Sequence, residues 1–269
     1  MASSSPLLVA VLLMSAAPVW AQASSPSDTV QAKSAARNEG QRVEIPGEEQ
    51  RVLVGSFFAP KDSKVAAPAA LLVHDADGQR SDLYEFAEKL QKQGFAVLVL
   101  DLRGHGESTG SDTPWAKLSD DEKIKVWSAT VRDLKFGADW LGKHDGVQRA
   151  NVSMLGDRAG CALVARRAVS DENVRSIVLL DPQAEQLGFN VTKDIQQLRG
   201  VPTYIAVTKE AQPKAEVIAA SSEKANDGMK YVEVAVFKGV ALSPCVDKRL
   251  PSDISKFMFA KAVPKKTDK

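Results

Sequence analysis

The chain has 269 residues, of which 35 are lysine or arginine, 34 are aspartate or glutamate and 44% are hydrophobic. This composition is typical of a globular protein large enough for one sizeable α/β domain, and it lacks the basic excess of a nucleic-acid-binding domain. Two cysteines and three histidines argue against a disulfide framework or a structural zinc site. We therefore expect no metal, no cofactor and no nucleic-acid partner.

The first 23 residues have the pattern of an export signal. Residues 6–14 are an apolar run too short to span a bilayer, and Ala21 and Ala23 follow at the spacing of a signal-peptidase site. No lysine or arginine precedes Lys33, so a buried N-terminal helix is the alternative. We expect a signal peptide over residues 1–23 and, with it, an extracytoplasmic protein that is secreted or periplasmic.

The segment after this leader, residues 24–41, is rich in serine, alanine, glutamine and charge, which predicts a disordered spacer. No later run is apolar for long enough to predict a transmembrane helix, so we do not expect an integral membrane protein. Residues 263–269 form a basic tail.

From residue 42 onward, short apolar runs alternate with amphipathic stretches. The apolar runs predict strands at residues 42–45, 51–58, 69–74, 95–100, 151–155, 176–180, 203–207 and 231–237. Helical spacing predicts helices from Ser81 to Gly94, around Trp127–Leu141, and at residues 161–169, 214–225 and 252–262. This order predicts one doubly wound α/β domain over residues 42–262, with a mostly parallel sheet and an N-terminal antiparallel hairpin.

Three loops carry a likeness to a known family. One strand ends in Val73-His74-Asp75, the next loop reads Asp-Leu-Arg-Gly-His-Gly-Glu-Ser over residues 101–108, and Gly156-Asp-Arg-Ala-Gly160 joins a strand to a helix. Together they resemble the α/β-hydrolase superfamily, most of all its monoacylglycerol-lipase and serine-aminopeptidase branch; a dienelactone-hydrolase-like relative is the second choice. The link over residues 181–200 is too short for a large lid domain.

The resemblance also locates the three positions at which such hydrolases hold a Ser–Asp–His triad, and none carries the expected residue. Arg158 stands at the nucleophile position, Ala211 at the acid position and Leu242 at the base position. A guanidinium stays protonated and is not a nucleophile. The sequence therefore predicts a degenerate triad, which disfavours hydrolysis through an acyl-enzyme.

Displaced residues are the alternative source of catalysis. The candidates for nucleophile or acid are Asp157, Cys161, Asp181 and Glu210. A base is harder to find, because His74 and His105 resemble structural positions of the family and His144 precedes a strand at the opposite end of the sheet.

A pocket at the carboxyl ends of the strands would survive the loss of the triad. The resemblance implies that the backbone amides of Ala76 and Ala159 point into it, together with the positive end of the following helix. Arg158 then either completes a site for a small anionic ligand or pairs with a carboxylate and plugs the site. The second interpretation is favoured, and the candidate partners are Asp75, Asp77, Asp157 and Asp181.

The resemblance further places the loops that carry Cys161 and Cys245 opposite each other, which supports the hypothesis of a disulfide between them in an oxidising compartment. Three functions stay open. The favoured one is a non-catalytic binding or scaffolding protein with a hydrolase fold. The others are an esterase- or peptidase-like hydrolase that uses displaced residues, and a structural envelope protein with a vestigial pocket.

Overall fold

The computed structural model describes residues 1, 38–61, 65–110, 112–242 and 245–262. The expected signal peptide beyond Met1, nearly all of the expected spacer and the basic tail lie outside the described residues. The chain divides into Met1–Ala36 and Arg37–Lys269, and the fold given below is that of the second unit.

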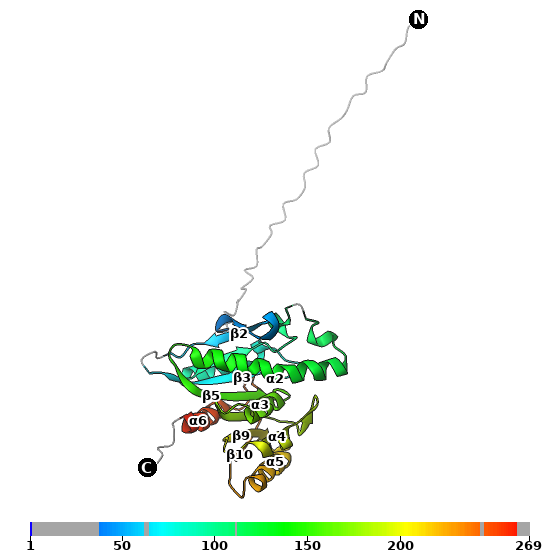
Figure 1. Ribbon diagram of the computed structural model, residues 1–269. Helices are drawn as coiled ribbons and strands as arrows, with labels where there is room; N and C mark the ends of the chain where they lie inside the picture. Colours follow the sequence, from blue (N-terminus) through cyan, green and yellow to red (C-terminus); the bar gives the residue numbers. More distant parts are fainter. Residues whose placement is uncertain (2–37, 62–64, 111, 243–244, 263–269) are drawn as a thin grey trace, which may run out of the picture. The chain divides into compact units, whose positions relative to one another are not determined.

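Eight strands form one mixed sheet in the order β1-β2-β4-β3-β5-β6-β9-β10 (Figure 1). They are β1 (Gln41–Pro46), β2 (Val52–Phe58), β3 (Ala67–Val73), β4 (Ala96–Leu100), β5 (Val147–Asp157), β6 (Val174–Leu180), β9 (Thr203–Thr208) and β10 (Val232–Phe237). β2 pairs antiparallel with both β1 and β4, whereas every other neighbouring pair is parallel. The predicted sheet with its N-terminal hairpin is confirmed.

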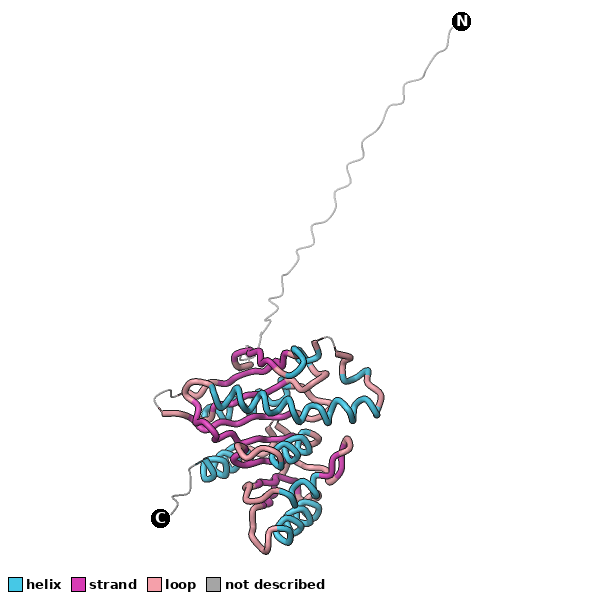
Figure 2. Tube along the Cα trace, in the orientation of Figure 1, coloured by secondary structure: helices cyan, strands magenta, loops and turns pink. Residues whose placement is uncertain are grey.

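Helices cover both faces of this sheet. They are α1 (Tyr84–Lys92), α2 (Asp120–Lys143), α3 (Gly160–Val169), α4 (Val191–Gln197), α5 (Gln212–Ala225) and α6 (Leu250–Ala262). Buried side chains of α1 and α6 belong to one apolar cluster and those of α2 to α5 belong to another. The longest helix, α2, lies along the sheet (Figure 2). Within the described ranges, no helix is both long and apolar enough to cross a membrane.

The continuous apolar sequence of β3 follows from its burial on two sides. Ala69, Leu71 and Val73 pack into the cluster beneath α2, while Ala70 and Leu72 pack into the cluster beneath α1 and α6. All five side chains are fully buried. A strand covered on both faces has no polar face to present, so its sequence shows no alternation.

The structure corrects the prediction that Ser81 caps the first helix. The chain first forms a short 3-10 helix, Arg80–Leu83, and the Asp82 carboxylate accepts a hydrogen bond from the Gln79 backbone amide at 2.9 Å. α1 therefore begins at Tyr84 and not directly after Ser81. Other 3-10 helices are Glu48–Gln50, Gly106–Thr109 and Trp115–Lys117.

The link over residues 181–200 has structure that the sequence analysis missed. It contains a small hairpin, β7 (Glu185–Gln186) with β8 (Phe189–Asn190), followed by α4. These elements are too short to produce a readable hydrophobic period. The expectation that no large lid domain is inserted there is confirmed.

Candidate functional site

The turn between β5 and α3 is a tight strand-to-helix elbow with Arg158 at its tip. β5 ends at Asp157 and α3 begins at Gly160. Arg158 has a φ of 44°, a left-handed conformation that is costly for any residue with a side chain. Its backbone amide donates to the Leu180 carbonyl at 2.9 Å, which ties the elbow to the end of β6.

The two glycines that flank the elbow are required by close packing. A Cβ atom on Gly160 would lie 2.7 Å from the carbonyl oxygens of both Val73 and His74, and one on Gly156 would lie 2.6 Å from the Cys161 amide nitrogen. Backbone atoms cannot move aside as a flexible side chain can. The two glycines of the Gly-x-Arg-x-Gly sequence therefore allow the tight backbone of the elbow, although its central residue is an arginine.

The side chain of Arg158 pairs with two carboxylates. Its Nε lies 2.8 Å from Asp75 Oδ2 and its Nη2 lies 3.3 Å from Asp157 Oδ2, while about half of the side chain stays exposed. Asp77 instead accepts a hydrogen bond from the Trp115 indole at 3.2 Å. Of the four partners predicted from the sequence, the structure brings Asp75 and Asp157 to Arg158.

Asp75 also occupies the two backbone donors that were expected to line the pocket. Its Oδ1 atom accepts hydrogen bonds from the amides of Ala76 at 2.9 Å and Ala159 at 3.0 Å. These amides come from the loop after β3 and from the start of α3, so they converge on one point as an oxyanion hole does. The carboxylate of Asp75 lies at that point, where an external anion or a substrate oxygen would have to replace it.

The carboxyl of Asp157 has a pKa that its position at this site shifts upward. The residue is 8% exposed, and burial raises the pKa of its carboxyl from 3.8 to about 6. The charge of Arg158 lowers this pKa, whereas Asp75 and Asp181 raise it further. Asp181 follows β6 with a φ of 49° and lies half-buried at the same end of the sheet.

The histidines near the elbow are engaged in backbone hydrogen bonds. The Leu102 amide donates to His74 Nε2 at 3.1 Å, so Nδ1 carries the proton and donates to the Asp75 carbonyl at 2.6 Å. Burial lowers the pKa of His74 to about 3. The ring nitrogens of His105 lie 2.7 Å from the Ala76 carbonyl oxygen and 3.0 Å from the Arg103 carbonyl oxygen. Both nitrogens of each ring therefore face backbone groups.

The third histidine lies at the amino end of β5, opposite to the elbow, and neither of the other two triad positions carries a titratable side chain. His144 follows the last residue of α2, near the amino end of β5, and packs against Phe57, with ring centroids 4.3 Å apart. Ala211 directly precedes α5, and Leu242 is buried in the apolar cluster beneath α1 and α6. Glu210 is exposed, and hydrogen bonds from its own backbone and from Thr208 lower its pKa.

The structure contradicts the hypothesis of a disulfide between the two cysteines, because both thiols are free. Cys161 is fully buried in the cluster on the α2 face, and its thiol donates to the Gly156 carbonyl at 3.1 Å. Cys245 packs against the cluster on the opposite face of the sheet and donates to the Asp247 carbonyl at 3.3 Å. The sheet separates the two sulfur atoms. Burial raises the pKa of both thiols, most strongly that of Cys161.

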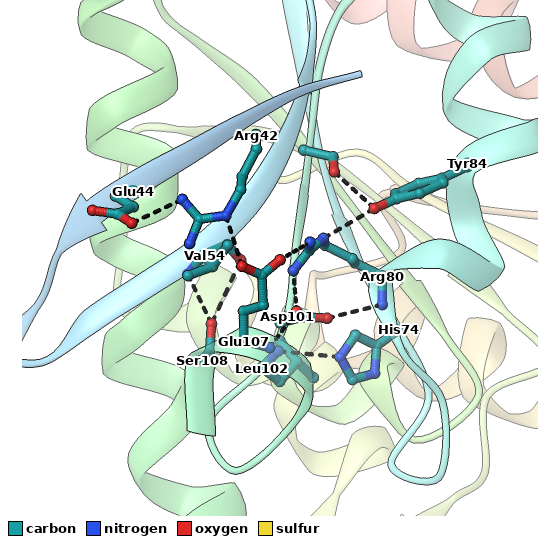
Figure 3. A network of polar contacts seen from close by, with 11 residues as sticks. Arg42, Glu44, Val54, His74, Arg80, Tyr84, Asp101, Leu102, Glu107 and Ser108 are labelled. Carbon is teal, nitrogen blue, oxygen red and sulfur yellow. Dashed lines mark hydrogen bonds and ion pairs between the residues drawn. The ribbon is translucent and has the colours of Figure 1, made fainter. Parts of the chain in front are cut away.

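The loop of residues 101–108 is held by a network of ion pairs (Figure 3). The Arg80 guanidinium pairs with both Asp101 and Glu107, and the backbone amides of Arg80 and Glu107 donate to Asp101 at 3.2 and 2.9 Å. Arg42 of β1 lies 2.7 Å from Glu107. This network fastens the loop to the antiparallel edge of the sheet, so its charged residues have a structural role.

Sequence reasoning missed two features of the site. It named Asp75 as one of four partners of Arg158, but no pattern indicated that the same carboxylate accepts both pocket amides. It also gave no role to Arg80, which lies about twenty residues from its partner Asp101 and follows no spacing rule. Both contacts depend on how loops from separate strands meet.

Comparison with known proteins identifies the relatives of this fold. A family model described as serine aminopeptidase, S33, matches residues 67–231, more than half of the chain. The multifunctional-autoprocessing repeats-in-toxin of Vibrio cholerae is 28% identical over 155 residues, which are 54% of this chain and 3% of the toxin. An uncharacterized 31.7 kDa protein from the traX-finO intergenic region of Escherichia coli is 25% identical over 122 residues, 45% of this chain and 39% of that protein. The chain thus spans well under half of either curated relative.

Solved structures share the fold at low sequence identity. The Pyrococcus furiosus esterase Pf2001 superposes with a TM-score of 0.64 and 16% identity, covering 83% of this chain and 91% of the esterase. A putative dienelactone hydrolase from Klebsiella pneumoniae gives a TM-score of 0.64 and 14% identity, covering 82% and 97% of the two chains. At such identities the likeness shows the fold alone.

We predict that Gly160→Ala strongly destabilises the protein, because the new Cβ atom would meet two backbone carbonyls at 2.7 Å. The expected loss in the free energy of unfolding is roughly 2–4 kcal/mol, measured by denaturant unfolding. The matched control is Gly142→Ala in α2, where the nearest atom to a Cβ is 3.9 Å away. This control should be neutral or gain up to about 1 kcal/mol. Equal effects of the two changes would contradict the packing argument.

A second prediction concerns the buried carboxyl of Asp157. Because its folded pKa of about 6 exceeds the ordinary 3.8, the folded protein keeps a proton that the unfolded chain loses between these values. Stability should therefore fall as pH rises from about 4 to about 6, by at most about 3 kcal/mol. In Asp157→Asn this part of the pH profile should disappear in denaturant unfolding. The control Asp145→Asn, at an exposed position, should keep the parent profile; an unchanged Asp157→Asn profile would contradict the assignment.

Proposed function

The chain belongs to the serine aminopeptidase (S33) family of α/β hydrolases, and we propose that within it this protein is an exported, non-catalytic binding or scaffolding protein. The observation that carries the proposal is the double hydrogen bond of Asp75 Oδ1 to the amides of Ala76 and Ala159. A carboxylate of the chain itself takes the position of the substrate oxygen, and Arg158 pairs with that carboxylate at 2.8 Å.

The chemistry of the elbow supports this reading. Acyl transfer needs a nucleophile, a base that accepts its proton and a pair of donors for the oxyanion. Arg158 supplies no nucleophile. The ring nitrogens of His74 and His105 face backbone groups. Cys161 is fully buried with a raised pKa, which opposes formation of a thiolate. The alternative of a hydrolase with displaced residues therefore has candidate carboxylates, but within the described residues no histidine beside them has a ring nitrogen turned away from the backbone.

The same contacts bear on a small anionic ligand at Arg158. Such a ligand would have to compete with the carboxylate of Asp75. Because Asp75 is part of the chain, it binds Arg158 without the loss of translational entropy that a free ligand undergoes on binding. We therefore propose that no small anion binds at Arg158. The ion pair between Asp75 and Arg158 fills the site instead. A structural envelope protein with a vestigial pocket remains compatible with it, and ligand-dependent shifts in melting temperature separate that role from a binding role.

Catalysis is tested directly on the unmodified protein. We expect no labelling by a serine-reactive fluorophosphonate and no saturable turnover of p-nitrophenyl acetate above the buffer background. Ester hydrolysis that is lost in Asp157→Asn, Cys161→Ala or Glu210→Gln would contradict the proposal and favour displaced catalytic residues. An active member of the esterase family serves as the positive control for both assays.

A set of restoring variants then tests which residue blocks the site. Arg158→Ser alone should stay inactive for lack of a base. Combining it with Ala211→Asp and Leu242→His restores the triad residues but leaves Asp75 in the oxyanion hole. Adding Asp75→Gly should raise kcat/KM by about 10²- to 10³-fold over the triple variant, the usual value of an oxyanion donor. Circular dichroism confirms that each variant folds, and equal rates with and without Asp75 would count against its blocking role.

Export is tested by the N-terminus of the protein. Mass spectrometry of material from its native compartment should find a chain that begins near Ser24, because Ala21 and Ala23 fit the site of signal-peptidase cleavage. Ala23→Arg should block processing, whereas Ala32→Arg, beyond the site, should not. A mature chain that begins at Met1 or Ala2 would exclude the signal peptide and the extracytoplasmic location.

A further inference from the structure

The outer strand β10 has one side that no other described strand covers, because it pairs with β9 alone. The Thr203 amide donates to the Tyr231 carbonyl at 2.8 Å, so Tyr231 turns its backbone groups toward β9. Alternate residues of a strand turn these groups to opposite sides. Val232, Val234 and Val236 therefore direct their amides and carbonyls away from the sheet. We call this the open side of β10, and it offers three donors and three acceptors to a further strand.

The other outer strand, β1, has features that hinder the addition of a strand. Pro46 has no amide to donate, and the exposed Arg42 and Glu44 pair with each other at 2.8 Å. Proline and charged side chains commonly protect outer strands in this way. β10 reads Val-Glu-Val-Ala-Val-Phe, with a single charge and no proline, and its Val236 is 37% exposed. β10 is therefore the outer strand that can receive another strand.

Two exposed charges, Glu233 and Lys238, determine which strand fits the open side. Phe237 packs into the cluster beneath α1 and α6, whereas Val234 packs against the cluster on the α2 face. Because side chains alternate, Glu233 shares the face of Phe237, and Lys238 follows on the face of Val234. Neither charge belongs to an ion pair within the described ranges. The Lys238 amide donates to Asp247 at 3.1 Å, so the open side ends there.

One segment of the chain carries the complementary charges at the required spacing. It reads Asp-Thr-Val-Gln-Ala-Lys-Ser over residues 28–34 and lies outside the described residues, so the match is one of sequence. Placing Asp28 opposite Lys238 fixes the register of an antiparallel ladder. Lys33 then lies opposite Glu233. No proline interrupts the segment, so every residue in it can adopt an extended conformation.

Other pairings lack this complementarity. In the antiparallel register Val30 also lies opposite Val236, a β-branched pair of the kind that stabilises such ladders. A parallel ladder that keeps the pair at Glu233 would set Asn38 opposite Lys238 and lose the second ion pair. β10 cannot pair with β10 of another copy in this way, because opposite residues of an antiparallel ladder both face the partner or both face away. Glu233 and Lys238 differ in this respect.

The segment can reach β10 only from a second copy of the chain. β1 and β10 are the first and last of eight strands, so about 34 Å lies between them. The chain from Ser34 to Gln41, the first residue of β1, spans at most about 25 Å. The segment of the same chain therefore falls short. A contact between two unlike surfaces links copies head to tail and does not close on itself in a pair.

We propose that residues 28–34 of one copy add to the open side of β10 of a second copy as an antiparallel strand. Backbone hydrogen bonds to Val232, Val234 and Val236 supply the affinity, and the two ion pairs fix the register. Ordering of the expected spacer costs free energy, so the copies associate at high protein concentration. The contact uses no residue of the elbow, and residues 28–34 are present whether or not a leader is cleaved after Ala23. It is therefore independent of the absence of hydrolysis and of export.

Sedimentation velocity of the mature protein, at low ionic strength and up to millimolar concentration, measures this self-association. Glu233→Lys should weaken it by about fivefold, because two lysines then face each other. Adding Lys33→Glu to the same chain should restore it to within twofold of the parent. The matched control is Asp145→Lys, which makes the same change of charge at an exposed position and should equal the parent.

A mixing experiment shows that the contact joins unlike surfaces. Lys33→Glu alone and Glu233→Lys alone should each associate weakly, whereas an equimolar mixture of the two variants should associate as the parent does. Val234→Pro removes one outward amide and spares the ladder with β9, so it should weaken association. Val234→Ala keeps the amide and should retain most of the association. Circular dichroism and melting temperature confirm that each variant folds.

Four results would overturn the proposal. They are a parent that stays monomeric at millimolar concentration, the same association in Glu233→Lys as in Asp145→Lys, a mixture no stronger than its separate components, and a folded Val234→Pro that associates as Val234→Ala does. Fluorophosphonate labelling of the same samples is read separately, so hydrolase activity and self-association fail or hold independently.

Discussion

The carboxylate of Asp75 is the interaction on which the elbow depends. One oxygen accepts the amides of Ala76 and Ala159, and the other accepts the Arg158 guanidinium, so a single side chain joins the loop after β3 to the start of α3. Partly buried amide donors need an acceptor, and a carboxylate at a helix N-terminus supplies one with favourable electrostatics. Its negative charge in turn favours a cation beside it. Asp75 and Arg158 therefore act as one unit, and their contributions to stability should not be additive.

The strained turn is kept because the surrounding backbone requires it. Gly156 and Gly160 allow contacts of the elbow with α3 and β3 that no larger residue could make, and these contacts hold the residue between them at positive φ. A side chain at this tip is directed away from the sheet and toward the loops. In a hydrolase that direction exposes a nucleophile; here it brings Arg158 to Asp75 and Asp157. The same backbone conformation can therefore position either a nucleophile or the side chain of an ion pair.

The sequence predicts the sheet well and the site only in part. Continuous apolar strands, and helices with clear spacing such as α2, fall where the pattern puts them, because burial leaves an unbroken apolar run in a strand covered on both faces and a helical period in a helix covered on one. The β7–β8 hairpin and the late start of α1 at Tyr84 depend on hydrogen bonds local to short segments, which leave no period. The sequence offers four aspartates as partners of Arg158, and only loop geometry selects Asp75 and Asp157 among them. The pairing of Cys161 with Cys245 fails because proximity of two loops does not say on which face of the sheet each sulfur lies.

The two edges of the parallel sheet thus differ in how their charges are satisfied. At the carboxyl edge, the carboxylate of Asp75 accepts a hydrogen bond from a backbone amide at the positive end of α3. The same carboxylate pairs with the guanidinium of Arg158. At the amino edge, Arg199 and Arg175 donate hydrogen bonds to carbonyl groups in the last turns of α5 and α6. The carboxyl edge is therefore closed electrostatically by residues of the chain itself.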